Sequence, residues 1–221
     1  ELALGDQLLT REEFERLAPL GEPILCIHPS AEVSGTVRSA TIARQDFPQL
    51  DIRVIDTRTI GSALFTLVRL AAEWAEAGID ADTIILRLEE RSQRGRIYFL
   101  VATLDYLQRG GRIGGAQALL GSVLQIKPIL TLKDGRVDRY ESERTHKRAL
   151  ARLQQIVVEQ IAADGDGDLT IMHAGVPDEG AALAQELGQQ LNPPAPQLFN
   201  LPPAIVTPGG PGILAACFFT T

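Results

Sequence analysis

Residues 24–36 read Ile-Leu-Cys-Ile-His-Pro-Ser-Ala-Glu-Val-Ser-Gly-Thr. The apolar run that opens this stretch predicts a strand over residues 22–28 that is covered on both faces. Residues 30–35 join this strand to a helix that is predicted to run to about Arg44. A strand that leads through a short hydroxyl-rich loop into a helix is typical of an α/β protein, in which ligands bind at the carboxyl ends of the strands.

The same alternation continues on both sides of this stretch. Thr10 and Glu13 have the spacing of a capping box, which predicts the start of a short helix that ends at Leu17. Further elements are predicted as a strand over residues 52–56, a helix over 62–77 that stops at Gly78, a helix over 80–94 and a strand over 96–102. Three strands that alternate with helices predict a mainly parallel sheet flanked by helices.

The second half of the chain has a different pattern. Asp134-Gly135 is a strong two-residue hairpin signal between the apolar residues of 126–133 and 136–143, so it predicts antiparallel pairing. The remaining elements are predicted as a helix over residues 145–163, a strand over 169–174, a helix over 177–191 and strands over 197–201 and 212–219. We therefore predict a two-domain α/β fold, with a first α/β domain over residues 18–115. Residues 1–17 and 116–221 are predicted to form a second domain with a mixed or antiparallel sheet.

Composition narrows the classes of function. The chain has 221 residues, of which 45% are hydrophobic and 22% charged, and its net charge of -7 offers no basic surface to nucleic acid. No apolar stretch approaches the roughly 18 residues that span a bilayer, and residues 1–9 lack the basic start of a signal peptide. We expect a cytoplasmic protein with no nucleic-acid partner and no stable membrane insertion. Cys26 and Cys217 lie in separate apolar runs, which predicts buried free thiols.

Residues 30–36 form the first candidate binding site. A helix N-terminus offers unpaired N–H donors and the positive end of a dipole, so it suits a carboxylate or a phosphate. The hydroxyls of Ser30, Ser34 and Thr36 could donate to the same anion, in a loop that also contains Ala31 and Gly35. The alternative is that Ser34 only caps the helix, as serine often does.

No other segment has a catalytic or metal-binding pattern. Residues 108–115, Gln-Arg-Gly-Gly-Arg-Ile-Gly-Gly, match neither the Walker pattern nor a dinucleotide fingerprint, and predict a tight turn with positive φ and exposed arginines. His28, His146 and His173 lie in different segments, outside any nucleophile or metal-ligand spacing. Residues 164–168 begin like a calcium loop but lack its closing glutamate, so they predict a solvated linker and no metal.

Several segments, in one order from Leu9 to the end, resemble the DegV family. Residues 30–36 are similar to the family's Ser-Ser-x-Leu-Ser-Gly-Thr loop, and Val-Ile-Asp-Thr-Arg-Thr at residues 54–59 is similar to its Val-Ile-Asp-Ser strand end. The most specific stretch is Leu-Asp-Tyr-Leu-Gln-Arg-Gly-Gly-Arg-Ile at 104–113, followed by Ala-Leu-Leu-Gly at 118–121, Ile-Lys-Pro-Ile-Leu at 126–130, the basic residues of 144–150 and Gly-Pro-Gly at 210–212.

The resemblance implies a long-chain fatty acid, such as palmitate, stearate or oleate, held between two domains, with no other cofactor. The residues it implies for ligand binding are Ser30, Ala31, Ser34, Gly35, Thr36, Thr59, Gly61, Ile126 and Gly210. It also implies a partner, a fatty acid kinase that phosphorylates the bound acid, and a chain that is itself not an enzyme. Arg144, Lys147 and Arg148 are the candidate docking residues for an acidic partner, unless they form only a solvated helix face.

The sequence departs from the family pattern at two places near the implied headgroup. Between Leu17 and Gly21, Ala-Pro-Leu replaces a Thr-Ser-x-Pro loop that donates a second hydroxyl. Pro208 stands where the family has a histidine that helps hold the headgroup, and proline cannot donate a hydrogen bond.

A hypothesis from a different class is an enzyme that acts on a small phosphorylated or carboxylated metabolite. Arg109, Arg112 and Arg144 would then clamp the anion. Its weakness is that the sequence offers no recognisable catalytic base.

Overall fold

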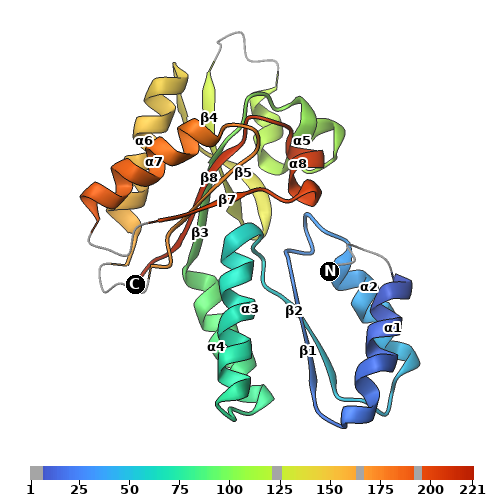
Figure 1. The fold of residues 1–221 in the computed structure, drawn as a ribbon. Coiled ribbons are helices and arrows are strands. Elements are labelled where there is room, and N and C mark those ends of the chain that lie inside the picture. Colours follow the sequence, from blue (N-terminus) through green and yellow to red (C-terminus); the bar gives the residue numbers. More distant parts are fainter. Residues whose placement is uncertain (1–6, 121–125, 163–166, 192–195) are drawn as a thin grey trace. The chain divides into compact units, whose positions relative to one another are not determined.

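The computed structural model describes residues 7–120, 126–162, 167–191 and 196–221 (Figure 1). The chain divides into two compact units, which we call unit 1 (residues 1–60 and 64–93) and unit 2 (residues 61–63 and 94–221). This division falls at Arg94, whereas the sequence predicted it near Gly115, and the helix that ends at Leu17 belongs to unit 1 rather than to the second domain. The difference arises because the strand after Arg94 pairs within the sheet of unit 2.

Unit 1 contains a two-stranded parallel sheet, in which His28 at the end of β1 pairs with Asp56 at the end of β2. Its elements are α1 (Gln7–Leu17), η1 (Ala18–Leu20), β1 (Ile24–His28), α2 (Thr36–Ala43), η2 (Arg44–Asp46), β2 (Ile52–Asp56), most of α3 (Gly61–Glu76) and α4 (Ala81–Arg94). The predicted capping box at Thr10 is wrong, because α1 already includes Gln7 and Thr10 lies inside it.

One face of this sheet is packed by α1 and α2. Phe14 of α1 meets Phe47 edge to face at 5.8 Å, in a cluster that includes Ile24 and Ile52 of the two strands. Because side chains alternate along a strand, Leu25 and its neighbours on the same face point to the other side of the sheet.

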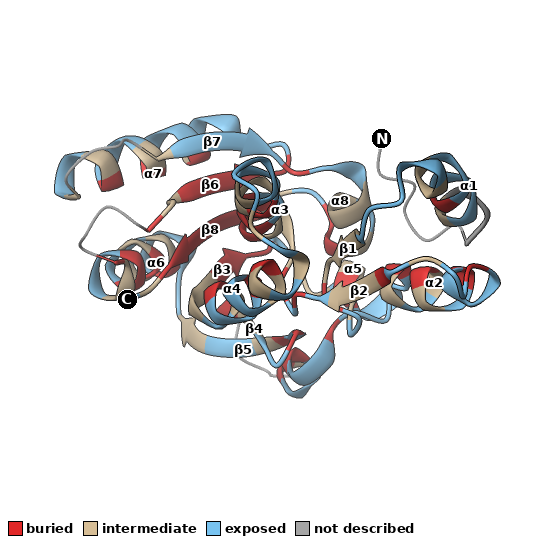
Figure 2. Cartoon of the chain, turned by 90° about the horizontal axis from the view of Figure 1, so that it is seen from below, coloured by how far each residue is buried: buried red, intermediate tan, exposed pale blue. Residues whose placement is uncertain are grey.

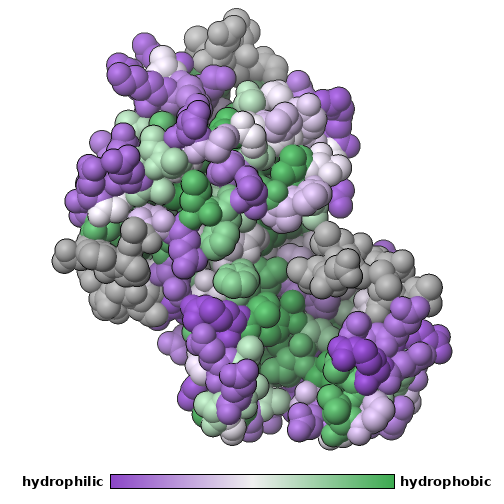
Figure 3. All heavy atoms as spheres, in the orientation of Figure 1, coloured by the Kyte–Doolittle hydropathy of each residue, from purple (hydrophilic) through white to green (hydrophobic). Residues whose placement is uncertain are grey.

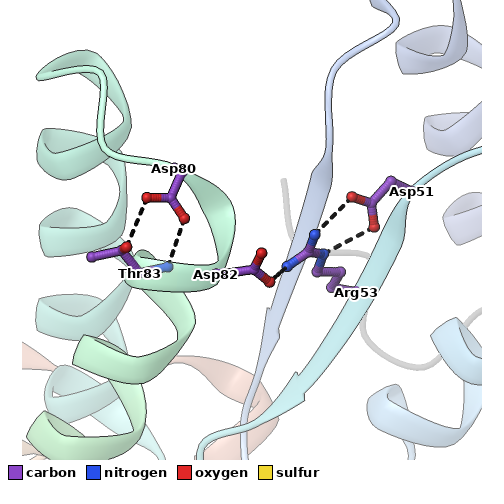
Figure 4. A network of polar contacts seen from close by, with 5 residues as sticks. All are labelled: Asp51, Arg53, Asp80, Asp82 and Thr83. Carbon is purple, nitrogen blue, oxygen red and sulfur yellow. Dashed lines mark hydrogen bonds and ion pairs between the residues drawn. The ribbon is translucent and has the colours of Figure 1, made fainter.

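Polar contacts tie the second strand to the start of α4 (Figure 4). The guanidinium of Arg53 on β2 pairs with Asp51 at 2.9 Å and also with Asp82 in the first turn of α4. Asp80 accepts hydrogen bonds from the N–H of Thr83 at 3.0 Å and from its hydroxyl at 2.7 Å, and these bonds hold the pKa of Asp80 below its usual value. Helix α4 therefore begins at a side-chain cap beside an ion-pair network.

Unit 2 is a six-stranded mixed sheet with the order β5-β4-β3-β8-β6-β7. Its elements are β3 (Gly95–Leu100), α5 (Asp105–Arg109), η3 (Gly114–Leu119), β4 (Lys127–Lys133), β5 (Arg136–Glu143), α6 (His146–Gln160), β6 (Thr170–His173), α7 (Pro177–Gln190), β7 (Gln197–Asn200), α8 (Pro203–Gly209) and β8 (Leu214–Phe219). The two-unit α/β fold with a mixed second sheet confirms the predicted fold class.

One detail of the predicted sheet is wrong. Strand β3 does not extend the parallel sheet of β1 and β2, because it pairs antiparallel with β4 on one side and β8 on the other. The predicted hairpin between β4 and β5 is confirmed. Asp134 has φ 51° and Gly135 has φ 81°, the left-handed pair that a two-residue hairpin turn of this kind requires.

The core of unit 2 lies between the sheet and helices α6 and α7. Leu153 and Ile156 of α6 and Leu187 of α7 are buried against Ile171 and Phe218 of the central strands. Figure 2 shows the inner strands β3, β6 and β8 buried and the edge strand β7 exposed. The short helix α8 was not predicted, because two of its seven residues are prolines.

Candidate functional site

The loop of residues 30–36 joins β1 to α2 in unit 1. Because β1 and β2 are parallel and in register, this loop lies beside the loop of residues 57–60, which follows β2. Ser30 is fully buried and Thr36 nearly so, whereas Ala31 and Gly35 are exposed. Polar groups from two strand ends therefore gather at one edge of the sheet, as expected for a site in an α/β unit.

Hydrogen bonds connect the two loops directly. The N–H of Ser30 donates to the carbonyl of Thr59 at 2.8 Å, and the hydroxyl of Thr57 donates to the carbonyl of His28 at 2.8 Å. The carboxylate of Asp56 accepts the N–H of Ala31 at 3.2 Å. Thr59, one of the predicted ligand residues, is thus brought to the 30–36 loop.

Several backbone N–H groups of the 30–36 loop donate to Ser30 and are therefore not available to an anion. The hydroxyl of Ser30 accepts the N–H of Glu32 at 3.2 Å, and its carbonyl accepts the N–H groups of Val33 at 3.2 Å and Ser34 at 3.0 Å. The N–H of Gly35 has no hydrogen bond to any residue that the structure describes. Gly35 therefore keeps a donor available to a ligand.

Ser34 and Thr36 supply a pair of hydroxyls at the start of α2. Their oxygens lie 3.2 Å apart, and Ser34 Oγ also accepts the N–H of Thr36 at 3.4 Å. Gly35 occupies the N-cap position and gives no side-chain cap. The helix-cap interpretation thus describes one contact of Ser34, while the two hydroxyls and the Gly35 N–H remain together as candidate donors.

His28 ends β1 beneath these loops. Its Nε2 is buried and has no hydrogen-bond partner among the described residues. Burial lowers the pKa of His28 below 6.5, and the nearby charge of Asp56 opposes this effect only in part. The imidazole is therefore neutral at neutral pH and adds no positive charge to the site.

Unit 1 also exposes an apolar surface. Leu25, Ile27 and Ile55 lie on the sheet face opposite the α1 and α2 cluster and are only half-buried. On α3, Phe65 and Val68 are 59% and 42% exposed. Figure 3 shows hydrophobic residues gathered in a hollow of unit 1 between α3 and the two-stranded sheet. An exposed apolar hollow of this kind marks a binding surface.

Three predicted ligand residues belong to unit 2. Gly61 has φ +64°, and a Cβ added to it would lie 3.1 Å from Sδ of Met172. Ile126 is half-buried just before β4, and Gly210, with φ +85°, follows α8. Among the predicted ligand residues, a hydrogen bond thus joins Thr59 of unit 1 to the 30–36 loop, whereas Gly61, Ile126 and Gly210 belong to unit 2.

The loop of residues 108–115 forms the predicted tight turn, with φ 68° at Gly111 and 51° at Gly114. Arg109 lies over the ring of Tyr106 at 4.8 Å, and Arg112 donates to the carbonyl of Gly110. Both guanidinium groups thus contact their own segment, which gives no specific support to an arginine clamp for a metabolite.

Pro208 packs against the same loop. A Cβ added to Gly110 would lie 3.0 Å from Cβ of Pro208, so α8 and the end of α5 are in close contact. At this position the side chain fills space between two elements of unit 2.

Arg144, Lys147 and Arg148 are exposed around the first turn of α6. None of them forms an ion pair with a described residue. Thr145 caps this helix, because its hydroxyl accepts the N–H of Arg148 at 3.2 Å. Cations at a helix N-terminus oppose the helix dipole, so this basic cluster costs stability and suits an external anionic group.

The described residues contain no group of three or more His, Cys, Asp or Glu side chains that could hold a metal ion. No helix among them is both long enough and apolar enough to cross a membrane. The predicted linker at 164–168 lies largely outside the described residues. Cys26 and Cys217 are free thiols as predicted, although Cys26 is only partly buried.

Fold and site together define a class of protein: a two-unit α/β chain with a hydroxyl-rich loop at the ends of parallel strands and an apolar hollow in the same unit. The chain belongs to the DegV family. The family described as "Uncharacterised protein, DegV family" matches residues 9–221.

Relatives and solved structures agree with this assignment. A DegV domain-containing protein of Streptomyces coelicolor is 43% identical over 180 residues, which cover 81% of this chain and 63% of that protein. This chain thus spans less than two thirds of that relative. A solved structure described as "Fatty Acid Binding of a DegV family Protein from Thermus thermophilus" has a TM-score of 0.87 and 31% identity, covering 98% of this chain and 77% of that one. DegV of Bacillus subtilis, described as a fatty acid binding protein, has a TM-score of 0.87, 29% identity and the same coverage.

Proposed function

We propose that this protein binds one long-chain fatty acid, such as palmitate, stearate or oleate, and is not itself an enzyme. The observation that carries the proposal is the TM-score of 0.87, at 31% identity, with the Thermus protein whose solved structure is described as fatty acid binding. The carboxylate is proposed to accept hydrogen bonds from Ser34, Thr36 and the N–H of Gly35, which lie together at the start of α2.

The acyl tail is proposed to lie against the apolar hollow of unit 1, whereas the resemblance alone implied a position between two domains. Phe65 and Val68 of α3 would otherwise face water at a free-energy cost. A sixteen-carbon tail buried at about 0.8 kcal/mol per CH₂ gives on the order of 10 kcal/mol before binding costs are subtracted. Burial of the tail would give tight binding even though several N–H groups of the 30–36 loop already donate to Ser30.

The test is denaturing extraction of the purified protein followed by mass spectrometry. We expect close to one equivalent of an acid of about 14–18 carbons, since a shorter tail buries too little surface for tight binding. A folded protein that carries no lipid, and takes up none when sodium palmitate is added, would contradict the proposal.

The position of the tail has a separate test. Phe65→Asp should lower the amount of palmitate retained, because a charge in the hollow is costly to bury with the tail. Phe199→Asp is the control, since Phe199 is also an exposed phenylalanine but lies on the edge strand β7 of unit 2. Equal retention by the two variants would place the tail elsewhere.

The finer part of the proposal is that the protein presents the bound acid to a fatty acid kinase. The basic cluster of Arg144, Lys147 and Arg148 supports a partner with an acidic surface, because these cations have no ion-pair partner among the described residues. A pull-down with a fatty acid kinase should weaken when salt is raised, because salt screens exposed charges over about 10 Å at 0.1 M. Binding that is insensitive to salt and to loss of the cluster would contradict this docking surface.

A further inference from the structure

Asp56 links the two loops that carry the candidate headgroup donors. It ends β2, directly opposite His28 at the end of β1. Its Oδ1 accepts two backbone N–H groups, one from Ala31 at 3.2 Å and one from Arg58 at 2.9 Å. One oxygen thus fixes a residue of the 30–36 loop and a residue of the 57–60 loop at the same time.

The bond to Arg58 maintains an unfavourable backbone conformation. Arg58 has φ 52°, in the left-handed region that residues with a side chain rarely adopt. A carboxylate that accepts the N–H two residues further along favours this kind of turn. The left-handed backbone of Arg58 is thus held by a hydrogen bond to Asp56, next to the candidate site. Backbone strain of this kind is often kept where a site needs a particular loop conformation.

The bond to Ala31 acts on the other loop. Ala31 directly follows Ser30, whose carbonyl accepts the N–H of Ser34. Fixing Ala31 therefore fixes the turn that delivers the hydroxyl of Ser34 to the start of α2. Without the bond, the N–H of Ala31 is free to turn toward solvent and the loop gains conformational freedom.

We propose that Asp56 is a positioning residue for the ligand carboxylate, and that it acts as a hydrogen-bond acceptor and not through its charge. The inference rests on the proposed function. The charge of Asp56 by itself disfavours a second carboxylate nearby, because like charges repel. Its contribution must then come from the geometry it imposes on residues 30–36.

Two substitutions separate these effects. Asp56→Asn keeps an oxygen that can accept both N–H groups and removes the charge, whereas Asp56→Ala removes the acceptor and the charge together. The measurement is the affinity of delipidated protein for palmitate by calorimetry, with the resonance of [1-¹³C]palmitate as a readout of the headgroup environment. Asp178→Ala, at an exposed aspartate of unit 2, is the control for loss of one negative charge.

We expect Asp56→Ala to weaken palmitate binding by about tenfold and to shift the carboxyl resonance, since the loss of the hydrogen bonds that fix the two loops is of this size. Asp56→Asn should bind within about threefold of the unmodified protein. Two results would overturn the proposal. One is equal palmitate affinity in the unmodified protein, Asp56→Ala and Asp56→Asn, and the other is an equal loss of affinity in the two Asp56 variants. If Asp56→Ala does not fold, the folded Asp56→Asn variant decides alone. A tenfold loss of palmitate affinity in Asp56→Asn would overturn the proposal, and an affinity within about threefold of the unmodified protein would support it.

A second readout does not depend on the lipid. In the amide spectrum of ligand-free protein, the peaks of Ala31 and Arg58 should move in Asp56→Ala and stay near their original positions in Asp56→Asn. If the unmodified protein takes up no palmitate, the proposed function fails, but these peaks still report whether Asp56 holds the two loops. Unmoved peaks in Asp56→Ala would refute the positioning role alone.

Discussion

Gly210 lies so close to the ring of Tyr106 that a Cβ on Gly210 would meet Cδ2 at 2.4 Å. Gly210 also has φ +85°, a conformation that disfavours any side chain. Gly210→Ala should therefore lower the free energy of unfolding by about 3 kcal/mol, from backbone strain and overpacking together. Urea unfolding would measure the loss.

Gly175→Ala is the control for this experiment. Gly175 lies in the same unit with φ +75°, but nothing lies within 4 Å of its added Cβ. It should lose only the backbone part, about 1 kcal/mol. Equal losses in the two variants would show that the contact with Tyr106 costs nothing.

The hydroxyl of Ser34 should contribute to ligand affinity. Ser34→Ala removes one of the two oxygens that lie 3.2 Å apart at the start of α2, and we expect palmitate binding to weaken about fivefold. Thr41→Val is the matched control, because the hydroxyl of Thr41 on the same helix donates to the carbonyl of Val37. Fluorescence titration with a labelled fatty acid would compare them, and a loss in both variants alike would assign the effect to helix stability.

The stability of unit 1 should depend on pH through His28. Burial lowers the pKa of His28 in the folded protein below 6.5, so the unfolded chain binds the proton first as the pH falls. The free energy of unfolding should be constant above about pH 6.5 and should fall below it, by at most about 1.4 kcal/mol per pH unit, until the folded pKa is reached.

His28→Gln should flatten this dependence, because glutamine has no group that titrates in this range. Urea unfolding at several pH values between about 5 and 8 checks this and stays mostly above the range in which carboxylates titrate. An unchanged pH dependence in His28→Gln would assign the loss to other groups.

Lys147 should lower the thermal stability of the protein, because it places a positive charge at the N-terminus of α6. Its proposed docking role would explain why a destabilising residue stands there. Lys147→Glu places an acidic group in the first turn of α6, where it favours the helix dipole, so we expect Tm to rise by about 1–3 °C. The same change should weaken binding to a fatty acid kinase. Lys133→Glu, at the exposed end of β4, should do neither. A stabilised Lys147→Glu protein that still binds the kinase would remove Lys147 from the interface.

Much of the fold could be predicted because local signals decided it. The apolar run from Ile24 to Ile27 and the dipeptide Asp134-Gly135 each specify an element without reference to distant residues. The partners of β3 could not be predicted in this way. Ile97 and Phe99 show that the strand is buried, but an apolar run does not state whether its neighbours run parallel or antiparallel.

The site shows the same division. Ser34 and Thr36 could be predicted as candidate donors because a hydroxyl-rich loop that opens a helix is recognisable from the sequence, and their role in ligand binding stays a prediction. The bond between Asp56 and Ala31 could not be predicted, because it depends on the register of two strands that are separated in the sequence by α2. The sequence shows that Asp56 ends the second predicted strand. Which loop it can reach is known only once the register places it opposite His28.

The sequence contains one tryptophan and one methionine, and the fold places them in different units. Trp74 of α3 lies in unit 1 with the guanidinium carbon of Arg87 at 5.4 Å from its ring. Met172 is buried in unit 2, where its Sδ accepts the N–H of Ser62 at 3.3 Å. The fluorescence of Trp74 can therefore follow the thermal unfolding of unit 1, and the ¹³C-labelled methyl resonance of Met172 can follow that of unit 2. Both are natural residues, so no probe has to be engineered into the protein.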